Sequence, residues 1–394
     1  MGDHMIEKSF DEVVLFARTG LNPRTNFKLG QGTNNYITIK NIHNNSIVID
    51  DNTDFVDDDA ITLIHKRSQI KKGDILFCSI GRIGDMYIIP EEPKGWDINE
   101  SVFAFTLNTN IIRQKYFYYI FKNQDTLDYL IQNSSGSTFK SIKMNQLKRM
   151  VFKLPSLGEQ DKIVTILDKV SSVISMRKKQ LSSLDKIIKS RFVEMFGDPI
   201  ENLKGWTLAP ISSFATVKIG PFGSMLHADD YIMGGHPLIN PSHLLNNTIV
   251  PDNNLTLTET KYQELAAYQL QIGDVIIGRR GEIGRCAVVE QDGLFCGTGS
   301  MFVRIREKCT PDFLQKIISF PSFKAILEDK AVGVTMKNLN AGIIADSLIP
   351  LPPKGLQENY VAIVAQLNKT KSAIHKSLEE TQLLFDSLMQ TYFG

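Results

Sequence analysis

Large and apolar residues recur at three- and four-residue intervals through two long stretches of the chain. One series runs from Ile163 to Met195 and the other from Tyr360 to Tyr392, and neither is interrupted by glycine or proline. Spacing of this kind predicts a coiled-coil seam. At ~1.5 Å per residue, each series would span roughly 50 Å of helix. The apolar seam positions are Ile163, Leu167, Val170, Ile174, Leu181, Leu184, Ile188, Val364, Leu367, Ile374, Leu378, Phe385 and Leu388.

The polar positions of the two series indicate how the helices are used. Where one series has a polar residue (Arg177, Lys371 or Thr381), the other has an apolar residue at the equivalent position. The alternative is that each helix packs inside an ordinary core, but uninterrupted helices of this length are unusual in globular domains. We therefore expect the two helices to pair with each other.

The regions ahead of each predicted helix have a mixed pattern. Short β-type runs such as "DILFCSI" and "DVIIG" alternate with turn residues, and helix-like stretches occur at Gln114–Ile131 and Pro311–Glu328. These regions also repeat each other: "GDILFCSIGRIG" at 73–84 returns as "GDVIIGRRGEIG" at 273–284, and "GSTFK" at 136–140 returns as "GVTMK" at 333–337. A tandem duplication follows, with mixed α and β domains at 1–157 and 200–354 and helical segments at 158–199 and 355–394.

Composition narrows the class of protein. A chain of 394 residues is too long for one ordinary core, so several domains are expected. The net charge is +1, so there is no overall excess of base. Locally, no acidic residue occurs between Asp128 and Glu159, whereas Asp50–Asp59 is strongly acidic and is expected to face away from any polyanion.

Two repeated loops carry the residue types that bind duplex DNA. Glycine allows close approach of the backbone, hydroxyl and amide groups suit phosphate, and lysine or arginine adds charge. The alternative for the 136–140 loop and its copy is a plain turn, and for Arg279, Arg280 and Arg285 it is a solvated turn with one intramolecular ion pair to Glu282. The candidate DNA-binding residues are Thr138, Lys140, Lys143 and Arg82 in the first copy, and Ser224, Arg279, Arg280, Arg285, Thr335, Lys337 and Asn338 in the second.

Motifs for catalysis are missing from the sequence. We find no G-x-x-x-x-G-K-[ST] phosphate loop, no Asn/Asp-Pro-Pro-Tyr methyltransferase motif and no G-x-G-x-x-G that opens a helix. The cysteines lack metal-ligand spacing and are interpreted as buried free thiols. We expect no catalytic residues, no metal and no cofactor in this chain. It has no apolar run of membrane-spanning length and no signal sequence at its start, so we expect the cytoplasm.

The helical segments resemble a known family. The stretch 154–199, with a Leu-Pro entry, Gln160 and a Phe-Gly-Asp-Pro exit, resembles the central helix of type I restriction–modification specificity subunits, and "LPPKGLQ" at 351–357 resembles its distal copy. "GPFGSMLHADDY" at 220–231 resembles the start of a target-recognition domain. The first copy has no obvious counterpart of Gly220-Pro221-Phe222-Gly223, and the distal helix has fewer basic residues than the proximal one.

The resemblance implies a division of labour. Each target-recognition domain would read one half of a bipartite DNA target, giving an α+β fold with a pseudo-twofold repeat. The two helices would pair antiparallel, space the domains and dock two modification subunits, which would bind S-adenosylmethionine and methylate DNA. Restriction (translocase) subunits could join that complex. Two other functions stay open from the residues: a duplicated protein-interaction scaffold, which the neutral charge allows, and a methyltransferase with an unrecognised motif.

Overall fold

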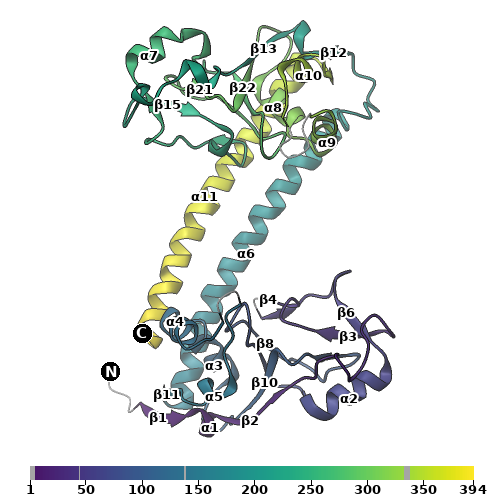
Figure 1. The fold of residues 1–394 in the computed structure, drawn as a ribbon, viewed down its shortest axis with the longest axis vertical. Coiled ribbons are helices and arrows are strands. Elements are labelled where there is room, and N and C mark those ends of the chain that lie inside the picture. Colours follow the sequence, from purple (N-terminus) through teal and green to yellow (C-terminus); the bar gives the residue numbers. More distant parts are fainter. Residues whose placement is uncertain (1–4, 44, 137–138, 332–337) are drawn as a thin grey trace. The chain divides into compact units, whose positions relative to one another are not determined.

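The computed structural model describes residues 5–43, 45–136, 139–331 and 338–394. The chain forms two compact units, Met1–Lys178 with Lys376–Gly394, and Lys179–His375. Each unit therefore contains one of the predicted mixed domains together with one half of each long helix, so the helical segments are shared between the units (Figure 1).

The first unit combines short strands with short helices. Its helices are α1 (Phe10–Val13), α2 (Asp58–Ser68), α3 (Gln114–Ile120), α4 (Gln124–Gln132) and α5 (Met144–Leu147). Its strands are β1 (Ile6–Ser9), β2 (Val14–Thr19), β3 (Asn34–Ile37), β4 (Ile42–His43), β5 (Ser46–Ile47), β6 (Asp54–Val56), β7 (Ile75–Cys78), β8 (Met86–Ile88), β9 (Trp96–Ile98), β10 (Val102–Leu107) and β11 (Val151–Leu154).

The central sheet of the first unit is buried on both faces. Its described strands run in the order β2-β10-β7-β8, and the pairs in it are antiparallel. Along β7, Ile75 and Phe77 enter one core cluster while Leu76 and Cys78 enter another on the opposite face. This follows from the two-residue period of a strand and explains the uninterrupted apolar run "ILFC". The α2 helix packs on β3 and β6 and forms a separate core cluster with them (Figure 1).

The second unit repeats this order. Its helices are α7 (Glu259–Glu264), α8 (Pro311–Ile318), α9 (Pro321–Lys330) and α10 (Ala341–Ala345). Its strands are β12 (Leu208–Pro210), β13 (Ala215–Ile219), β14 (Tyr231–Ile232), β15 (His236–Ile239), β16 (Leu244–Leu245), β17 (Thr248–Ile249), β18 (Thr256–Leu257), β19 (Val275–Gly278), β20 (Cys286–Val288), β21 (Phe295–Cys296), β22 (Ser300–Ile305) and β23 (Leu348–Pro350). The sheet β13-β22-β19-β20 matches β2-β10-β7-β8 strand for strand.

One buried carboxylate is held in the same place in both units. Arg18 of β2 donates to Asp74 at 2.8 Å and to the carbonyl of Gln69 at 2.7 Å. In the second unit, Arg304 donates to Asp274 at 2.6 Å and to the carbonyl of Gln269 at 3.0 Å. The acceptors are equivalent in the two units, but the arginines are not. Arg18 lies on β2, whereas Arg304 lies on β22, the counterpart of the neighbouring strand β10.

The long helices are α6 (Leu157–Phe196) and α11 (Lys354–Phe393), each of 40 residues. Every predicted seam position is buried or half-buried. In the first unit, Leu167 near the start of α6 shares a core cluster with Met389 near the end of α11. In the second unit, Phe192 near the end of α6 packs edge-on against Tyr360 near the start of α11, with ring centroids 5.5 Å apart. The predicted antiparallel coiled-coil pairing is therefore confirmed.

A polar residue of the seam finds a partner across it. Lys371 of α11 forms an ion pair with Asp185 of α6 at 2.5 Å. The helix segment predicted to extend to residue 199 ends at Phe196, because Gly197 follows with a φ of 80° and Pro199 cannot continue the helix. Gly197 donates its N–H to the carbonyl of Val193 at 2.8 Å, which closes the last turn.

The predicted helical stretches in the mixed domains were wrong in detail. Gln114–Ile131 is divided into α3 and α4, because Asn123 caps the second helix by accepting from the N–H of Asp125. Pro311–Glu328 is divided into α8 and α9, because Pro321 begins a new helix at its first turn. In both units the break falls at the equivalent point of the repeat.

The first turn of each long helix is joined to its domain by a buried glutamine. Gln160 donates to the carbonyls of Ile111 and Pro155, both at 3.0 Å, and accepts from the N–H of Arg113 at 2.9 Å. Gln357 makes the same set of bonds, donating to Lys308 and Pro352 and accepting from the N–H of Thr310. In both copies the glutamine side chain donates two hydrogen bonds and accepts one from equivalent backbone groups. This shared set of bonds explains why glutamine recurs at this place in the repeat.

Candidate nucleic-acid interface

Two equivalent loops follow the central strands β7 and β19, and their backbones are alike. The loop 79–85 has positive φ at Gly81 (71°) and Gly84 (89°), and the loop 279–285 has positive φ at Gly281 (79°) and Gly284 (83°). Side chains are disfavoured in this region of backbone space, so the glycines allow the tight turn. The repeated Gly-x-x-Gly of the sequence is thus a conformational requirement.

A second segment lies against each of these loops. In the first unit, Gly81 donates its N–H to the carbonyl of Lys140 at 3.1 Å, and Ile142 donates to Ser79 at 2.8 Å. In the second unit, Leu339 donates to the carbonyl of Arg279 at 3.0 Å, and Arg280 pairs with Asn338 in an isolated bridge. We call residues 79–85 with 139–143 the first loop surface, and residues 279–285 with 338–339 the second loop surface. Candidate residues that are far apart in the sequence are brought together in both units.

The first loop surface carries exposed lysines. Lys140 and Lys143 are both exposed, and neither forms an ion pair within the described residues. The backbone of Lys143 is fixed, since its N–H donates to the Gln146 side chain at 2.7 Å. Thr138, from the same predicted site, lies outside the described residues, as do Thr335 and Lys337 of the second copy.

Arg82 is occupied within the first unit. Its guanidinium contacts the His43 ring, donates to the carbonyl of Ile42 at 3.1 Å and lies 3.5 Å from a carboxylate oxygen of Asp85. Arg82 therefore ties its loop to the hairpin β4–β5, and its charge is partly neutralised.

The arginines of the second loop surface divide into two classes. Arg279 is half-buried and donates its Nε–H to the carbonyl of Leu339 at 3.0 Å; burial, and secondarily the charge of Arg280, lowers its pKa. Arg285 is paired with Glu282 at 2.8 Å, and Lys324 reaches the same carboxylate at 2.8 Å. Arg280 is exposed and has no side-chain hydrogen bond or ion pair within the described part of the chain. Arg280 is thus the cation of this loop that is available to a ligand.

Ser224 lies in a neighbouring loop that starts from the same sheet. It is exposed, in the short 3-10 turn η2 (Gly223–Met225). The N–H of Gly220 donates to the carbonyl of Ser300 at 3.0 Å, next to Gly299, whose carbonyl accepts from Arg279. A Cβ on Gly220 would lie 2.0 Å from the carbonyl oxygen of Gly297, so no other residue fits there.

The first unit does contain a counterpart of that glycine, which the sequence comparison missed. Gly20 follows β2 as Gly220 follows β13, and a Cβ on Gly20 would lie 1.7 Å from the carbonyl oxygen of Ile98. Only this first glycine of Gly220-Pro221-Phe222-Gly223 is shared, because it alone is required by the close backbone approach. A single shared glycine gives too little signal to be found in the sequence.

A second missed feature is a pair of hairpins beside the loops. The hairpin β4–β5 and the hairpin β16–β17 have similar sequences, "IHNNSIV" and "LLNNTIV", at an offset of 202. Asparagine tolerates the positive φ of two-residue hairpin turns, so an Asn-Asn pair between short apolar runs is compatible with a hairpin. The pair escaped notice because the flanking runs are short.

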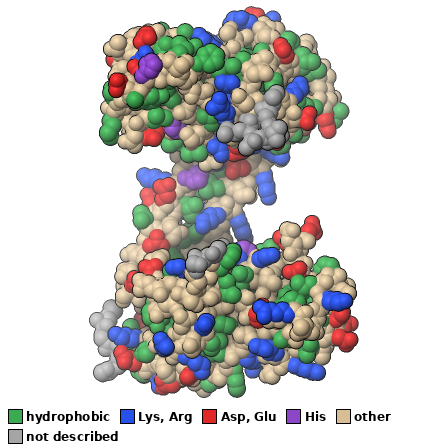
Figure 2. Space-filling model, in the orientation of Figure 1, with side chains coloured by type: hydrophobic (Ala, Val, Ile, Leu, Met, Phe, Trp, Pro, Cys, Tyr) green, Lys and Arg blue, Asp and Glu red, His purple; other side chains and the backbone are tan. Residues whose placement is uncertain are grey.

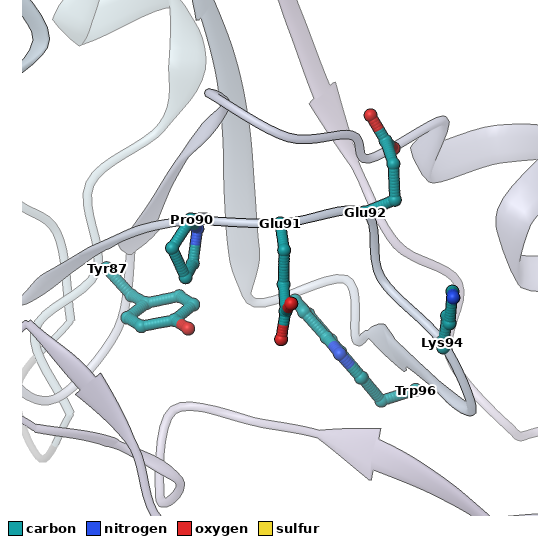
Figure 3. Close-up of a pocket in the computed structure, with 6 residues that line it drawn as sticks. All are labelled: Tyr87, Pro90, Glu91, Glu92, Lys94 and Trp96. Carbon is teal, nitrogen blue, oxygen red and sulfur yellow. The ribbon is translucent and has the colours of Figure 1, made fainter.

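A shallow cavity in the first unit lies outside these surfaces. It has a volume of about 270 Å³ and is lined by Tyr87, Pro90, Glu91, Glu92, Lys94 and Trp96. Figure 3 shows the Glu91 side chain between the rings of Tyr87 and Trp96. Desolvation, followed by the charge of Glu91, raises the pKa of Tyr87. Two carboxylates make this cavity a poor site for a nucleic-acid phosphate.

The predicted buried free thiols are confirmed. Cys78, Cys286, Cys296 and Cys309 are all buried and unpaired, and burial raises the pKa of Cys78, Cys286 and Cys309 to about 12. Within the described residues no His, Cys, Asp and Glu side chains gather in a group that could hold a metal ion.

Charged side chains of both signs are interspersed over the visible face of each unit (Figure 2).

The family model of the type I restriction modification DNA specificity domain matches the chain twice, over residues 6–186 and 204–382. These two matches follow the internal repeat and cover most of the chain. The chain belongs to the family of type I restriction–modification specificity subunits.

Individual relatives agree with this membership. The MjaIX specificity subunit of Methanocaldococcus jannaschii is 26% identical over 324 residues, which cover 75% of this chain and 71% of that protein. The EcoBI specificity subunit of Escherichia coli is 27% identical over 123 residues, 31% of this chain and 26% of that protein.

Solved structures share the fold. The S subunit of a type I system from M. genitalium has a TM-score of 0.60 at 14% identity, covering 100% of this chain and 97% of that one. A structure that describes complex assembly and conformational transition of the type I restriction–modification system has a TM-score of 0.60 at 16% identity, covering 99% and 97%. The predicted fold, with two recognition domains and two long helices, is confirmed.

Membership settles the class of activity. A specificity subunit is the DNA-recognition component of a type I restriction–modification system and is not itself catalytic. The scaffold and methyltransferase alternatives that the residues left open are therefore set aside. No described helix is both long and apolar enough to cross a membrane.

Proposed function

We propose that this specificity subunit holds duplex DNA on its two loop surfaces, one for each half of the target. The observation that carries the proposal is the repeated joining of two candidate loops: hydrogen bonds connect residues 79–81 with 140–142 in one unit and residues 279–280 with 338–339 in the other. Loops held by a rigid sheet are the usual place for recognition residues.

The exposed cations of these surfaces would bind phosphates. Lys140 and Lys143 in the first unit and Arg280 in the second supply charge without an internal partner among the described residues. Contacts to phosphate position a protein on the duplex, while neighbouring uncharged side chains read the base edges. Lys337 and the hydroxyls of Thr138 and Thr335 are proposed, from the sequence, for the same task.

The outer faces of the long helices are proposed to dock two modification subunits. Apolar side chains there are exposed, including Leu383 (70%) and Leu384 (52%) of α11 and Met176 (53%) of α6. The duplication of the chain supports two such partners. S-adenosylmethionine would be bound by these partners, with none held by this chain, and restriction subunits could join the same complex.

The helices are also proposed to set the distance between the two half-sites. Inserting one heptad after Ser182 and another after Glu379 keeps the seam in register and adds ~10 Å to each helix. The preferred spacer should grow by about three base pairs, with both half-site sequences kept. A functional insertion mutant with the original spacer would refute the spacing role.

The proposed function is tested by binding of the assembled complex to duplex DNA at several salt concentrations. Replacing Lys140 by alanine should weaken binding to all sequences and lower the salt slope by about one unit, since one phosphate contact is lost. Lys153, exposed on β11 outside the loop surface, provides a matched control. Equal slopes for wild type, Lys140→Ala and Lys153→Ala would reject the first loop surface as a phosphate site.

A further inference from the structure

The hairpin β16–β17 ends in a tight two-residue turn. Leu245 pairs with Thr248 across the strands, so the loop consists of Asn246 and Asn247 alone. Both have positive φ, 50° and 63°. These values describe the turn that matches the twist of a hairpin, and asparagine is one of the few residues other than glycine that adopts it readily.

The side chains at this tip are not used by the fold. Asn246 and Asn247 are exposed, and among the described residues neither side chain makes a hydrogen bond. Other asparagines of the same unit are engaged: Asn202 bonds twice to Trp206, and Asn340 accepts from the N–H of Ile343 at 2.9 Å. The turn needs only the backbone of the asparagines, so each amide keeps its donor and acceptor for a ligand.

The stem places this tip beside the second loop surface. Leu244 is buried in a core cluster with Ile276 of β19 and Ala287 of β20. Just before the stem, Pro241 packs so closely that a Cβ on Gly278 or Gly299 would lie 3.1 or 3.0 Å from it. Gly278 directly precedes Arg279, whose N–H donates to the carbonyl of Gly299 at 3.0 Å. The start of the hairpin therefore lies against Gly278, the residue directly before the Arg280 loop.

The chemistry of the tip suits a base pair better than a phosphate. Residues 240–251 contain no acidic side chain to repel DNA and no lysine or arginine to bind phosphate. Exposed Leu245 and Thr248 flank the two amides and provide methyl groups. In the major groove an asparagine amide matches the N6 and N7 atoms of adenine, and apolar groups match the thymine methyl. A two-stranded β-ribbon is narrow enough to enter that groove.

We propose that Asn246 and Asn247 form a base-reading element of the second recognition domain, directed at an adenine–thymine pair in the major groove. This proposal rests on the proposed function. The first unit differs at the equivalent tip, because Asn45 accepts from the N–H of Ile88 at 2.9 Å and its oxygen is occupied. Asn44, the equivalent of Asn246, lies outside the described residues, so the proposal concerns the second unit alone.

The test exploits the fact that glycine also accepts positive φ. Asn246→Gly and Asn247→Gly keep the turn and remove the amide. The complex with modification subunits is presented with a pool of duplexes, and the bound fraction is sequenced. We expect discrimination at one or two adjacent base pairs of one half-site to fall roughly 5- to 100-fold, with the salt slope unchanged. Asn253→Gly, an exposed asparagine of the same unit, is the control and should leave all preferences intact.

The outcomes separate this proposal from the proposed function. If both glycine variants discriminate as wild type does, the asparagines only form the turn and the proposal is wrong. A uniform loss over all sequences with a reduced salt slope would make the tip a phosphate contact and also overturn it. If wild type itself selects no sequence, the proposed function fails. Asn246→Asp keeps a residue that tolerates positive φ but removes the amide donors, so it should lose the same discrimination.

Discussion

The loops 79–85 and 279–285 have the same backbone conformation but different charged side chains. Glycines with positive φ stand at the same two places in both. At the residue after each glycine, Arg82 and Asp85 of the first unit are replaced by Glu282 and Arg285 of the second, so the ion pair has its polarity reversed. The conformation is fixed by glycine and buried neighbours, whereas the exposed side chains have diverged. Two loops with the same backbone conformation and different side chains are what two different half-sites require.

The arginines that pair with the buried carboxylates also differ between the two units. The repeat preserves the buried carboxylate, Asp74 or Asp274, and not the position of its cation, which lies on β2 in one unit and on β22 in the other. A buried carboxylate needs partners, but either neighbouring strand can supply them. The following predictions use these differences between the units.

The largest effect is expected in the seam. Leu167 is fully buried, whereas Val364, its equivalent in the repeat, is half-buried. Leu167→Asp should lower the free energy of unfolding by several kcal/mol, because an unpaired charge enters the core. Val364→Asp should cost less, since water reaches that position. Chemical denaturation of both variants measures the difference; equal losses would show that the two ends of the seam are packed alike.

The next effect concerns the buried carboxylates. Arg304→Met leaves Asp274 with the N–H of Gln271 as its donor, and should destabilise by about 3 kcal/mol. Arg18→Met leaves Asp74 with the hydroxyl of Thr106 and the N–H of Lys71, so the loss should be roughly 1.5 kcal/mol smaller. Thermal or urea unfolding measures which variant loses more stability. A greater loss for Arg18→Met would contradict the expectation that the remaining hydrogen bonds of Asp74 compensate in part for the lost arginine.

A smaller effect is expected for DNA binding by the second loop surface. Arg280→Ala should weaken binding to all duplexes and reduce the salt slope by about one unit. Arg285→Ala is the matched control, because this arginine is already paired with Glu282. Salt titrations of both complexes provide the measurement. If Arg285→Ala changes the slope as much as Arg280→Ala, the internal pair does not withhold Arg285 from DNA.

The smallest effect is expected from copying the charges of the first loop into the second. The double change Glu282→Arg with Arg285→Asp, made in a Lys324→Gln background because Lys324 also pairs with Glu282, should alter the free energy of unfolding by less than about 1 kcal/mol, since exposed ion pairs contribute little. A matched unfolding series with each single change measures this. A much larger loss for the double variant would mean that the polarity of the pair is part of the fold.

The sequence predicted what is periodic or repeated in register. Ile163–Met195 and its copy indicated long paired helices, and the repeated glycines at 81, 84, 281 and 284 indicated equivalent loops. Contacts between distant segments were not predictable, because nothing in "GSTFK" shows that Lys140 bonds to Gly81. The internal pairing of Arg82 and Arg285 likewise depends on neighbours that only the folded chain brings close.

Gly20 shows a different limit. One glycine carries no recognisable motif, although its backbone contact is as tight as that of Gly220. The break between α3 and α4 was missed because the apolar pattern continues through Phe121, which is buried although it lies outside both helices. In both cases tertiary packing decides the conformation while the local sequence stays ambiguous.

The central claim is that the two loop surfaces act separately on two half-sites. It is tested most directly by replacing residues 279–285 with the sequence of residues 79–85, assembling the complex with modification subunits and sequencing the duplexes that it selects from a random pool. The account predicts that selection of one half of the target is weakened, because that domain loses the phosphate contact of Arg280, while selection of the other half is kept. Changes in both halves at once, or in neither, would contradict it.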